Sequence, residues 1–170
     1  MWLGLAFTCL FLALAAAIWG AEKALAKAKK ASALMAESVE RTSQREQFIT
    51  SITDAMPGLV AYWDKEMRCQ FANKPYLEWF GKRPEEIIGM HMRDFLGEVL
   101  FAKNESYING ALAGQAQQFE RTLIKADGSS GYTWAQYVPD ISVQGDVKGF
   151  FVLVSDITQL KEAQSALKQS

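Results

Sequence analysis

Residues Gly149–Thr158 read GFFVLVSDIT, and the segment QLKEAQSALKQ follows directly. The nearly continuous apolar run is typical of a central β-strand that is covered on both faces. After Thr158 the pattern changes, because Leu160, Ala163 and Leu167 recur at spacings of three and four residues, the period of a helix face. We therefore expect a strand that passes directly into an exit helix, so that a disturbance of the sheet can move the helix.

The rest of the globular part also contains strand patterns. Lys65-Glu66 is a polar turn between two strands, which predicts a hairpin. The loop Asp127–Gly131 predicts a second hairpin, and Pro139 indicates a bulge or a sheet edge. The expected strands are 59–64 (LVAYWD), 67–73 (MRCQFAN), 116–126 (AQQFERTLIKA), 132–143 (YTWAQYVPDISV) and 147–155. Regular alternation within the third would place Phe119, Arg121, Leu123 and Lys125 on one side.

Between the second and third strands the patterns are helical. Tyr76 and Phe80 are four residues apart, on one helix face, and Gly81 follows them as a helix end. Pro84 opens a short acidic helix, which the helix dipole favours. The expected helices are 74–80, 84–89 and 94–114. The order of strand, strand, helices, three strands and helix predicts an α+β fold, a five-stranded antiparallel sheet with short helices on one face.

The first twenty residues, 1–20, contain no charge. Twenty helical residues span about 30 Å, the thickness of the hydrocarbon layer of a membrane. Lysines follow at once, at 23, 27, 29 and 30, so the positive-inside rule places the rest of the chain in the cytoplasm. We expect a single-pass anchor in the inner (cytoplasmic) membrane. A cleavable signal peptide is the alternative, although no basic residue precedes the apolar run.

The segment 21–56 is rich in Ala, Lys, Glu and Gln and predicts a helical connector. Leu25, Met35 and Val39 belong to a seam of spacing three and four that is interrupted by polar residues. A dimeric coiled coil is one interpretation, and a solvated single helix is the other. The connector should end before Pro57-Gly58.

Composition excludes several classes of function. The net charge is -1 and the pI about 5.9, so no basic field for nucleic acid is present. The two cysteines, Cys9 and Cys69, are far apart, and His91 is the only histidine. These residues provide neither a metal-ligand set nor a catalytic triad. We expect no metal and no enzymatic activity in this chain.

Four stretches together resemble the PAS sensor domain over about Gln47 to Gln159: DAMPGLVAYWDKEMRCQFAN, EWFGKRPEEIIGMHMRDFLG, KADGSSGYTWAQYVPD and GFFVLVSDIT. The branch most similar is that of bacterial sensor histidine kinases and diguanylate cyclases. The resemblance implies a sheet that cups a small cavity against short helices. It also implies that Asp156, Ile157 and Thr158 couple the sheet to the exit helix. The expected domains are 1–20 (anchor), 21–56 (connector), 57–158 (PAS domain) and 159–170 (signalling helix).

The resemblance also bears on cofactors, which the sequence leaves unknown. Haem-binding relatives carry an axial histidine at the position of Asn104, and flavin photoreceptors carry a cysteine in the stretch MHMRDFL, so haem and covalent flavin are disfavoured. A pocket for a small molecule is expected instead, or a filled aromatic core. In such a pocket Arg121, if inward, would suit an anion. The candidate lining residues are Val60, Tyr62, Phe71, Asn73, Tyr76, Phe80, Phe119, Arg121, Trp134 and Gln136.

These features together predict a membrane-anchored PAS sensory module of a two-component or cyclase system. It would form a homodimer through its flanking helices and act on a histidine kinase or diguanylate cyclase domain, in cis or in trans. A stand-alone protein-interaction module and a redox sensor with non-covalently bound flavin are the alternatives.

Overall fold

The computed structural model of the chain describes residues 2–168, and it describes side chains at 14, 15 and 17–168. The chain divides into two compact units, Met1–Ile49 and Thr50–Ser170. The first unit is formed by the helix α1 (Trp2–Ala55), which continues into the second. The helix ends before Pro57-Gly58, as the sequence predicts.

The helix α1 covers the residues for which the sequence predicts an anchor and a connector. No helix within the described residues is long and apolar enough to cross a membrane. Most of the segment 1–20 lies outside the described side chains, and so does the greater part of the anchor prediction. In the connector, Leu25, Met35 and Val39 are exposed, and Glu37 pairs with Arg41 across one helical turn at 2.7 Å. Such exposed pairs contribute only about 0.3–0.5 kcal/mol.

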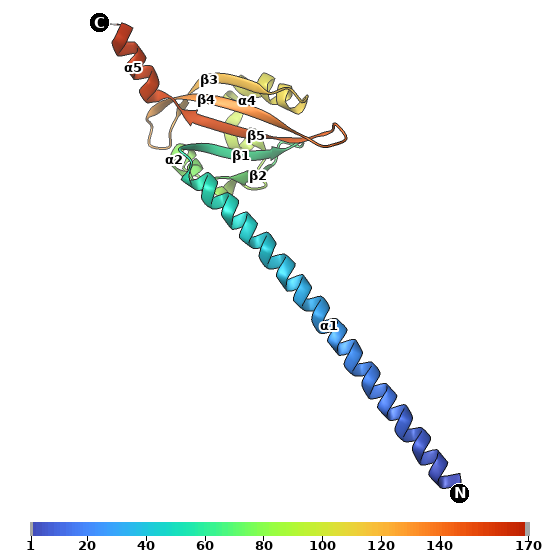
Figure 1. Cartoon of the computed structure of the whole chain (residues 1–170). Helices are drawn as coiled ribbons and strands as arrows, with labels where there is room; N and C mark the ends of the chain where they lie inside the picture. The colour runs from blue at the N-terminus through green and yellow to red at the C-terminus, as the bar shows by residue number, and fades with distance from the viewer. Residues whose placement is uncertain (1, 169–170) are drawn as a thin grey trace. The chain divides into compact units, whose positions relative to one another are not determined.

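The second unit is built on a five-stranded antiparallel sheet in the order β2-β1-β5-β4-β3 (Figure 1). The strands are β1 (Gly58–Asp64), β2 (Cys69–Ala72), β3 (Gln117–Ile124), β4 (Ser130–Ile141) and β5 (Val147–Asp156). The predicted fold class is therefore confirmed. The strand that carries the GFFVLV sequence is the central one, because β5 pairs with β1 on one side and with β4 on the other.

Helices cover one face of this sheet. They are α2 (Tyr76–Phe80), α3 (Pro84–Ile87) and α4 (Met92–Leu112), and α4 packs against β3, β4 and β5. The helix α4 is interrupted at Gly97, where φ is 72° and ψ is 161°. His91 begins α4 as an N-cap, since its Nδ1 accepts a hydrogen bond from the Arg93 N–H at 3.2 Å. The exit helix α5 (Thr158–Lys168) follows β5 after one residue.

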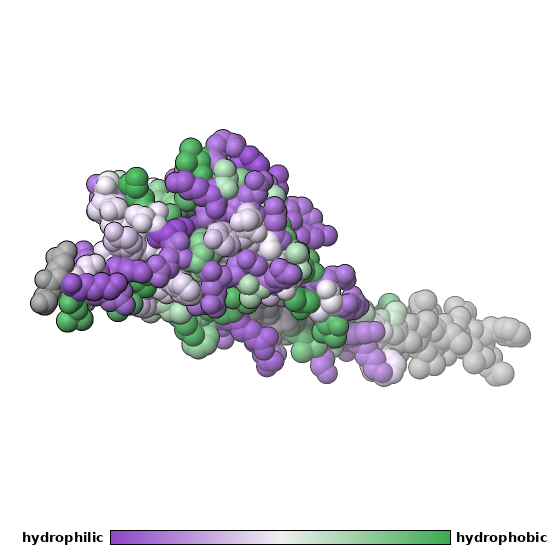
Figure 2. All heavy atoms as spheres, turned by 90° about the horizontal axis from the view of Figure 1, so that it is seen from above, coloured by the Kyte–Doolittle hydropathy of each residue, from purple (hydrophilic) through white to green (hydrophobic). Residues whose placement is uncertain are grey.

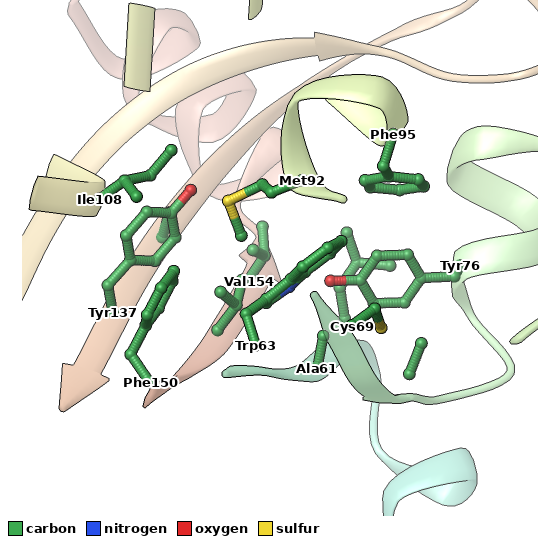
Figure 3. Packing of buried hydrophobic residues seen from close by; sticks show 14 of the residues in the cluster. Ala61, Trp63, Cys69, Tyr76, Met92, Phe95, Ile108, Tyr137, Phe150 and Val154 are labelled. Atoms are coloured by element: carbon green, nitrogen blue, oxygen red, sulfur yellow. The ribbon is translucent and has the colours of Figure 1, made fainter. Parts of the chain in front are cut away.

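The core lies between this sheet face and the helices. Alternate strand residues enter it, including Trp63, Tyr137 and Phe150, and Tyr76, Met92 and Phe95 meet them from the helices (Figure 3). The expectation that β5 is covered on both faces is wrong. Phe150, Val152 and Val154 are buried, whereas Phe151 on the other face is 42% exposed and packs in a tilted arrangement against the Tyr62 ring. The strand β5 is central because it is hydrogen-bonded on both edges. On its outer face, Phe151 packs only against side chains of the neighbouring strands, such as Tyr62.

The outer surface has no single hydrophobic area on the side seen in Figure 2, where hydrophobic residues are scattered among hydrophilic ones. Isolated exposed apolar residues of this kind are normal in soluble domains and indicate no binding site by themselves.

Candidate functional site

Two parts of the second unit are candidates for function: a small cavity inside the core, and the contacts that hold the exit helix. The cavity lies between the inner sheet face and the helices, and its volume is about 10 Å³. That is about the space of one water molecule. Its walls include Trp63, Tyr76, Met92, Phe95 and Tyr137 (Figure 3).

The structure divides the ten predicted pocket residues among three places. Tyr76, Phe80 and Arg121 line the cavity. Phe119 belongs to the same face and stacks on Tyr107, with 3.8 Å between ring centroids. Five others lie on the opposite face of the sheet: Val60, Tyr62, Phe71, Trp134 and Gln136. The tenth, Asn73, is buried at the end of β2.

The alternation of strands explains the misplaced residues. The inward residues of β1 are Leu59, Ala61 and Trp63, and those of β4 include Ala135 and Tyr137, so a shift of one position selects the wrong face. In β2 the register with β1 shifts between Tyr62 and Trp63. Tyr62 pairs with Phe71 just before this shift, and residues directly opposite share a face, so Phe71 lies with Tyr62 on the outer side.

Sequence reasoning missed seven residues that line the cavity: Leu59, Trp63, Met92, Phe95, Leu96, Tyr137 and Val152. Trp63 and Tyr137 each lie two residues after a buried alanine, Ala61 and Ala135, so strand alternation places them on the same inner face. Met92 and Phe95 depend on the position of α4 against the sheet, for which no local signal exists.

Arg121 is the one charged residue that lines the cavity. Its Nη1 donates to the Tyr137 hydroxyl at a long 3.5 Å, and its guanidinium carbon lies 5.5 Å from the centre of the Phe119 ring. The Nε–H of Arg121 is buried without a hydrogen-bond partner. Within residues 14–168, no carboxylate forms an ion pair with this side chain. A buried donor without an acceptor is costly, by about 1–3 kcal/mol.

The Asn73 side chain is a structural link between the entering helix and the sheet. Its Oδ1 accepts from the Val60 N–H at 2.9 Å, and its Nδ2 donates to the carbonyls of Thr53 at 2.8 Å and Gly58 at 2.9 Å. The Lys74 N–H adds a bond to the Asp54 carboxylate at 2.7 Å. All the hydrogen-bonding atoms of the Asn73 amide are thus used in fixing where α1 ends and β1 begins.

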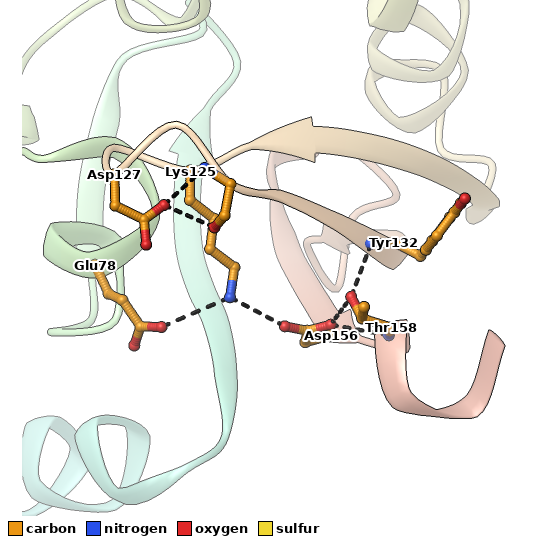
Figure 4. Close-up of polar contacts among 7 residues, drawn as sticks. Glu78, Lys125, Asp127, Tyr132, Asp156 and Thr158 are labelled. Carbon is orange, nitrogen blue, oxygen red and sulfur yellow. Dashed lines mark hydrogen bonds and ion pairs between the residues drawn. The ribbon is translucent and has the colours of Figure 1, made fainter. Parts of the chain in front are cut away.

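The predicted coupling residues meet at the junction of β5 and α5 (Figure 4). Asp156 Oδ1 accepts from the Thr158 N–H at 2.9 Å and from the Thr158 hydroxyl at 2.5 Å. The Thr158 hydroxyl oxygen accepts from the Tyr132 N–H at 2.9 Å, and the Ile157 N–H donates to the Tyr132 carbonyl at 2.8 Å. The start of the exit helix is therefore bonded to β4 as well as to β5.

Lys125 extends this network toward the cavity. Its Nζ lies 3.3 Å from Asp156 Oδ2 and 3.7 Å from Glu78 Oε1, and 4.4 Å from the centre of the Trp79 ring. Glu78 and Trp79 belong to α2, the helix whose Tyr76 faces the cavity. Lys125 thus contacts both the cavity helix and the coupling carboxylate (Figure 4).

The charge of Asp156 is stabilised by this network. Partial burial would raise the pKa of its carboxyl, but hydrogen bonds from Thr158 and the nearby Lys125 ammonium outweigh burial and hold the pKa below its usual range. Asp156 is therefore ionised at neutral pH and acts as an acceptor. A second ion pair, Lys161 to Glu120 at 2.7 Å, joins the first turns of α5 to β3.

The residues considered for metal or cofactor chemistry have structural contacts. Cys69 is fully buried, its thiol donates to the Phe71 carbonyl at 3.3 Å, and burial raises its pKa to about 11. Asn104 is buried, and its Nδ2 donates to the Leu100 carbonyl at 2.8 Å. The described side chains contain no group that could hold a metal ion. A flavin does not fit a cavity of about 10 Å³.

A sheet of this order, with helices over a small cavity on one face and an exit helix after the last strand, defines a domain of the α+β class. Residues 53–162 match the PAS fold, and the chain belongs to that family. A search of curated proteins finds no match.

Solved structures agree on the fold. An RNA-binding light-oxygen-voltage receptor aligns with a TM-score of 0.59 at 20% identity, covering 75% of this chain and 37% of that one. The PAS domain of BvgS from Bordetella pertussis aligns with a TM-score of 0.56 at 21% identity, covering 74% and 98%. The Vibrio cholerae VqmA dimer, a LuxR-type receptor, aligns with a TM-score of 0.58 at 22% identity, covering 68% and 52%. At these identities the likeness concerns the fold alone.

Proposed function

We propose that this PAS domain is a signal-transmitting module that changes the arrangement of its exit helix when a small molecule or partner binds. The observation that carries the proposal is the bonding of Asp156 and Thr158 to β4 and Lys125 at the start of α5. A helix held by so few specific bonds can adopt a second arrangement when one strand moves.

The proposed mechanism is a population shift. A ligand favours one of two sheet and helix arrangements by no more than its difference in affinity for them. Lys125 provides a route for this preference, because it contacts Glu78 on the cavity helix α2 and Asp156 at the exit. A movement of α2 therefore changes the ion pair that holds the coupling carboxylate.

The output domain, in this proposal, is a histidine kinase or diguanylate cyclase domain in cis or in trans. Two chains would pair through α1 and α5, which presents Leu160 and Leu167 as exposed apolar residues. The uncharged segment 1–20 followed by lysines supports an inner-membrane anchor with the PAS domain in the cytoplasm. An anchor would confine both copies to one plane and raise their effective concentration.

A second candidate is a stand-alone module that binds another protein through its outer sheet face. The observation that favours it is the partly exposed apolar pair Phe151 and Val138, which face each other on β5 and β4. In that case α5 would have no transmitting role, and variants at its junction would leave binding unchanged.

A chimera tests the first proposal. The full chain is fused after Ser170 to a kinase catalytic region in several helical registers, and autophosphorylation is measured in membranes. Asp156→Ala and Thr158→Val should shift the basal output by about fivefold or more, the lower end of allosteric coupling. Asp127→Ala is the matched control, because this carboxylate lies in the turn between β3 and β4 and accepts hydrogen bonds only from Ser129 in that turn. Equal outputs of all three variants and the parent in every register would refute the proposal.

A further inference from the structure

The inner cavity and an outer cleft share part of their walls. The cleft has a volume of about 450 Å³ and lies between α4 and β3, with Val99, Lys103 and Leu123 among its walls. Phe80 and Leu96 line both the cleft and the cavity. These two side chains therefore separate a cavity of about 10 Å³ from open space, and their displacement would join the two.

One of these residues is next to a break in its helix. Leu96 directly precedes Gly97, whose φ of 72° and ψ of 161° interrupt α4. This conformation is open essentially to glycine alone. Met92, Phe95 and Leu96 belong to the first turn of α4. This turn is joined to the rest of the helix through Gly97, whose backbone angles are not helical. That turn can shift without bending the remainder of α4.

Arg121 lines the same cavity as Phe80 and Leu96 and carries a hydrogen-bond donor without a partner. The Arg121 Nε–H is buried without an acceptor, and its Nη1 reaches only the Tyr137 hydroxyl, at 3.5 Å. The aromatic walls of the cavity supply no anion. A carboxylate is the group that would satisfy a guanidinium through two parallel hydrogen bonds.

The cleft does not select for charge by itself. Its charged wall residues are Lys103 and Glu98, which have opposite signs, and Glu98 pairs with Arg93 at 2.8 Å. Any preference for an anion must therefore come from Arg121 inside the cavity.

We propose that the cavity, enlarged by outward movement of Phe80 and Leu96, binds a small apolar molecule that carries one carboxylate, with the carboxylate on Arg121. The apolar part replaces the displaced side chains among Trp63, Tyr76 and Phe95. This inference rests on the proposed sensory function, since it names the class of ligand that the cavity would take. Access is through the cleft, and Leu96 and Phe80 are its gate.

The test compares two probes of nearly equal shape, phenylacetate and its neutral amide phenylacetamide. Each is titrated to about 10 mM, which detects weak binding, into the full ¹⁵N-labelled chain in one non-ionic detergent. The Arg121 Nε–H signal, identified by its loss in Arg121→Lys, reports directly on the unpartnered donor. Phenylacetate should bind about tenfold or more tightly than phenylacetamide and should shift this signal, because charge-assisted hydrogen bonds are the stronger ones. Arg121→Gln should remove the preference, and Arg83→Gln, on the surface, should preserve it.

The access route has its own control. Leu96 lines cavity and cleft, whereas Val99 lines the cleft alone and is 74% exposed. Leu96→Ala should raise the association rate several-fold relative to Val99→Ala, measured from NMR line shapes.

Three results would overturn the proposal. The first is equal affinity for phenylacetate and phenylacetamide. The second is an Arg121 Nε–H signal that does not move with phenylacetate, nor with two further carboxylates, acetate and benzoate. The third is an association rate that Leu96→Ala leaves at the value of Val99→Ala, which overturns the gate. The binding test uses the chain without an output domain, whereas the coupling test uses the kinase chimera. Either proposal can therefore be refuted while the other holds.

Discussion

The buried amide of Asn73 offers a quantitative test of how the entering helix is joined to the sheet. Asn73→Asp keeps the shape of the side chain and keeps the acceptor for the Val60 N–H. It replaces the Nδ2 donor with an oxygen, which then faces the carbonyl oxygens of Thr53 and Gly58 at 2.8 and 2.9 Å. Two hydrogen bonds become two repulsive contacts in a site without solvent exposure.

The magnitude follows from these two contacts. Each lost bond with a buried partner costs about 1–3 kcal/mol, so the free energy of unfolding should fall by about 2–6 kcal/mol near pH 8. The introduced carboxyl should have a raised pKa, because its charged form is desolvated and faces carbonyls. A raised pKa means that the deficit is smaller near pH 4, where the protonated carboxyl can still donate one of the two bonds. The deficit grows as pH rises through the pKa of the folded state, by up to about 1.4 kcal/mol per pH unit.

Urea unfolding at pH 5 and pH 8, followed by near-ultraviolet circular dichroism of the core aromatic residues, measures this deficit. Asn109→Asp is the matched control, because Asn109 is exposed on α4, and it should change stability by about 0.5 kcal/mol or less apart from a small helix-dipole effect. If Asn73→Asp costs no more than the control, or costs the same at both pH values, the assigned role of the amide is wrong.

Three shorter predictions concern the sheet and its core. Gly149→Ala should destabilise the fold by about 3 kcal/mol or more in urea unfolding, because a Cβ there would meet the Trp63 carbonyl oxygen on the neighbouring strand. Burial, with the hydrogen bond to Asp140, raises the pKa of Tyr62 to about 12. The contribution of the neutral phenol to folding stability is therefore complete below about pH 10 and is lost as pH rises toward 12. Tyr62→Phe should make the free energy of unfolding less dependent on pH in that range. The Cys69 thiol, with a pKa raised to about 11 by burial, should resist iodoacetamide at pH 8 until urea unfolds the domain, as peptide mass spectrometry would show.

Local patterns were sufficient for the fold. The order of strands and helices, the end of α1 before Pro57 and the passage of β5 into α5 all depend on residues close together in the sequence. The bonding of Asp156 to Thr158 is equally local, because the two residues are two positions apart. Contacts between residues this close in the sequence do not depend on tertiary packing, so they can be predicted from the sequence.

The cavity was harder to predict because it depends on strand parity and on tertiary packing. Trp134 was expected to line the pocket, whereas the alternation of β4 turns Tyr137 inward and Trp134 to the other face. Phe71 pairs with Tyr62 and lies with it on the outer face, and the register shift that follows turns Cys69 inward without a glycine or proline in β2 to signal it. The distant partners of this junction, Lys125 for Asp156 and Tyr132 for Thr158, come from a hairpin that precedes them by more than 20 residues in the sequence.

The proposed ligand site and the exit helix are connected through one hairpin rather than through the sheet as a whole. Arg121 lines the cavity from β3, and its carbonyl accepts a hydrogen bond from the Thr133 hydroxyl on β4 at 2.9 Å. Next to Thr133, Tyr132 holds the first residues of α5 through both its N–H and its carbonyl. A carboxylate that draws Arg121 toward the cavity therefore acts on the strand pair that fixes the exit helix. The strands β1 and β2, which are tied to α1 through Asn73, need not move, so the two helices would respond to different events.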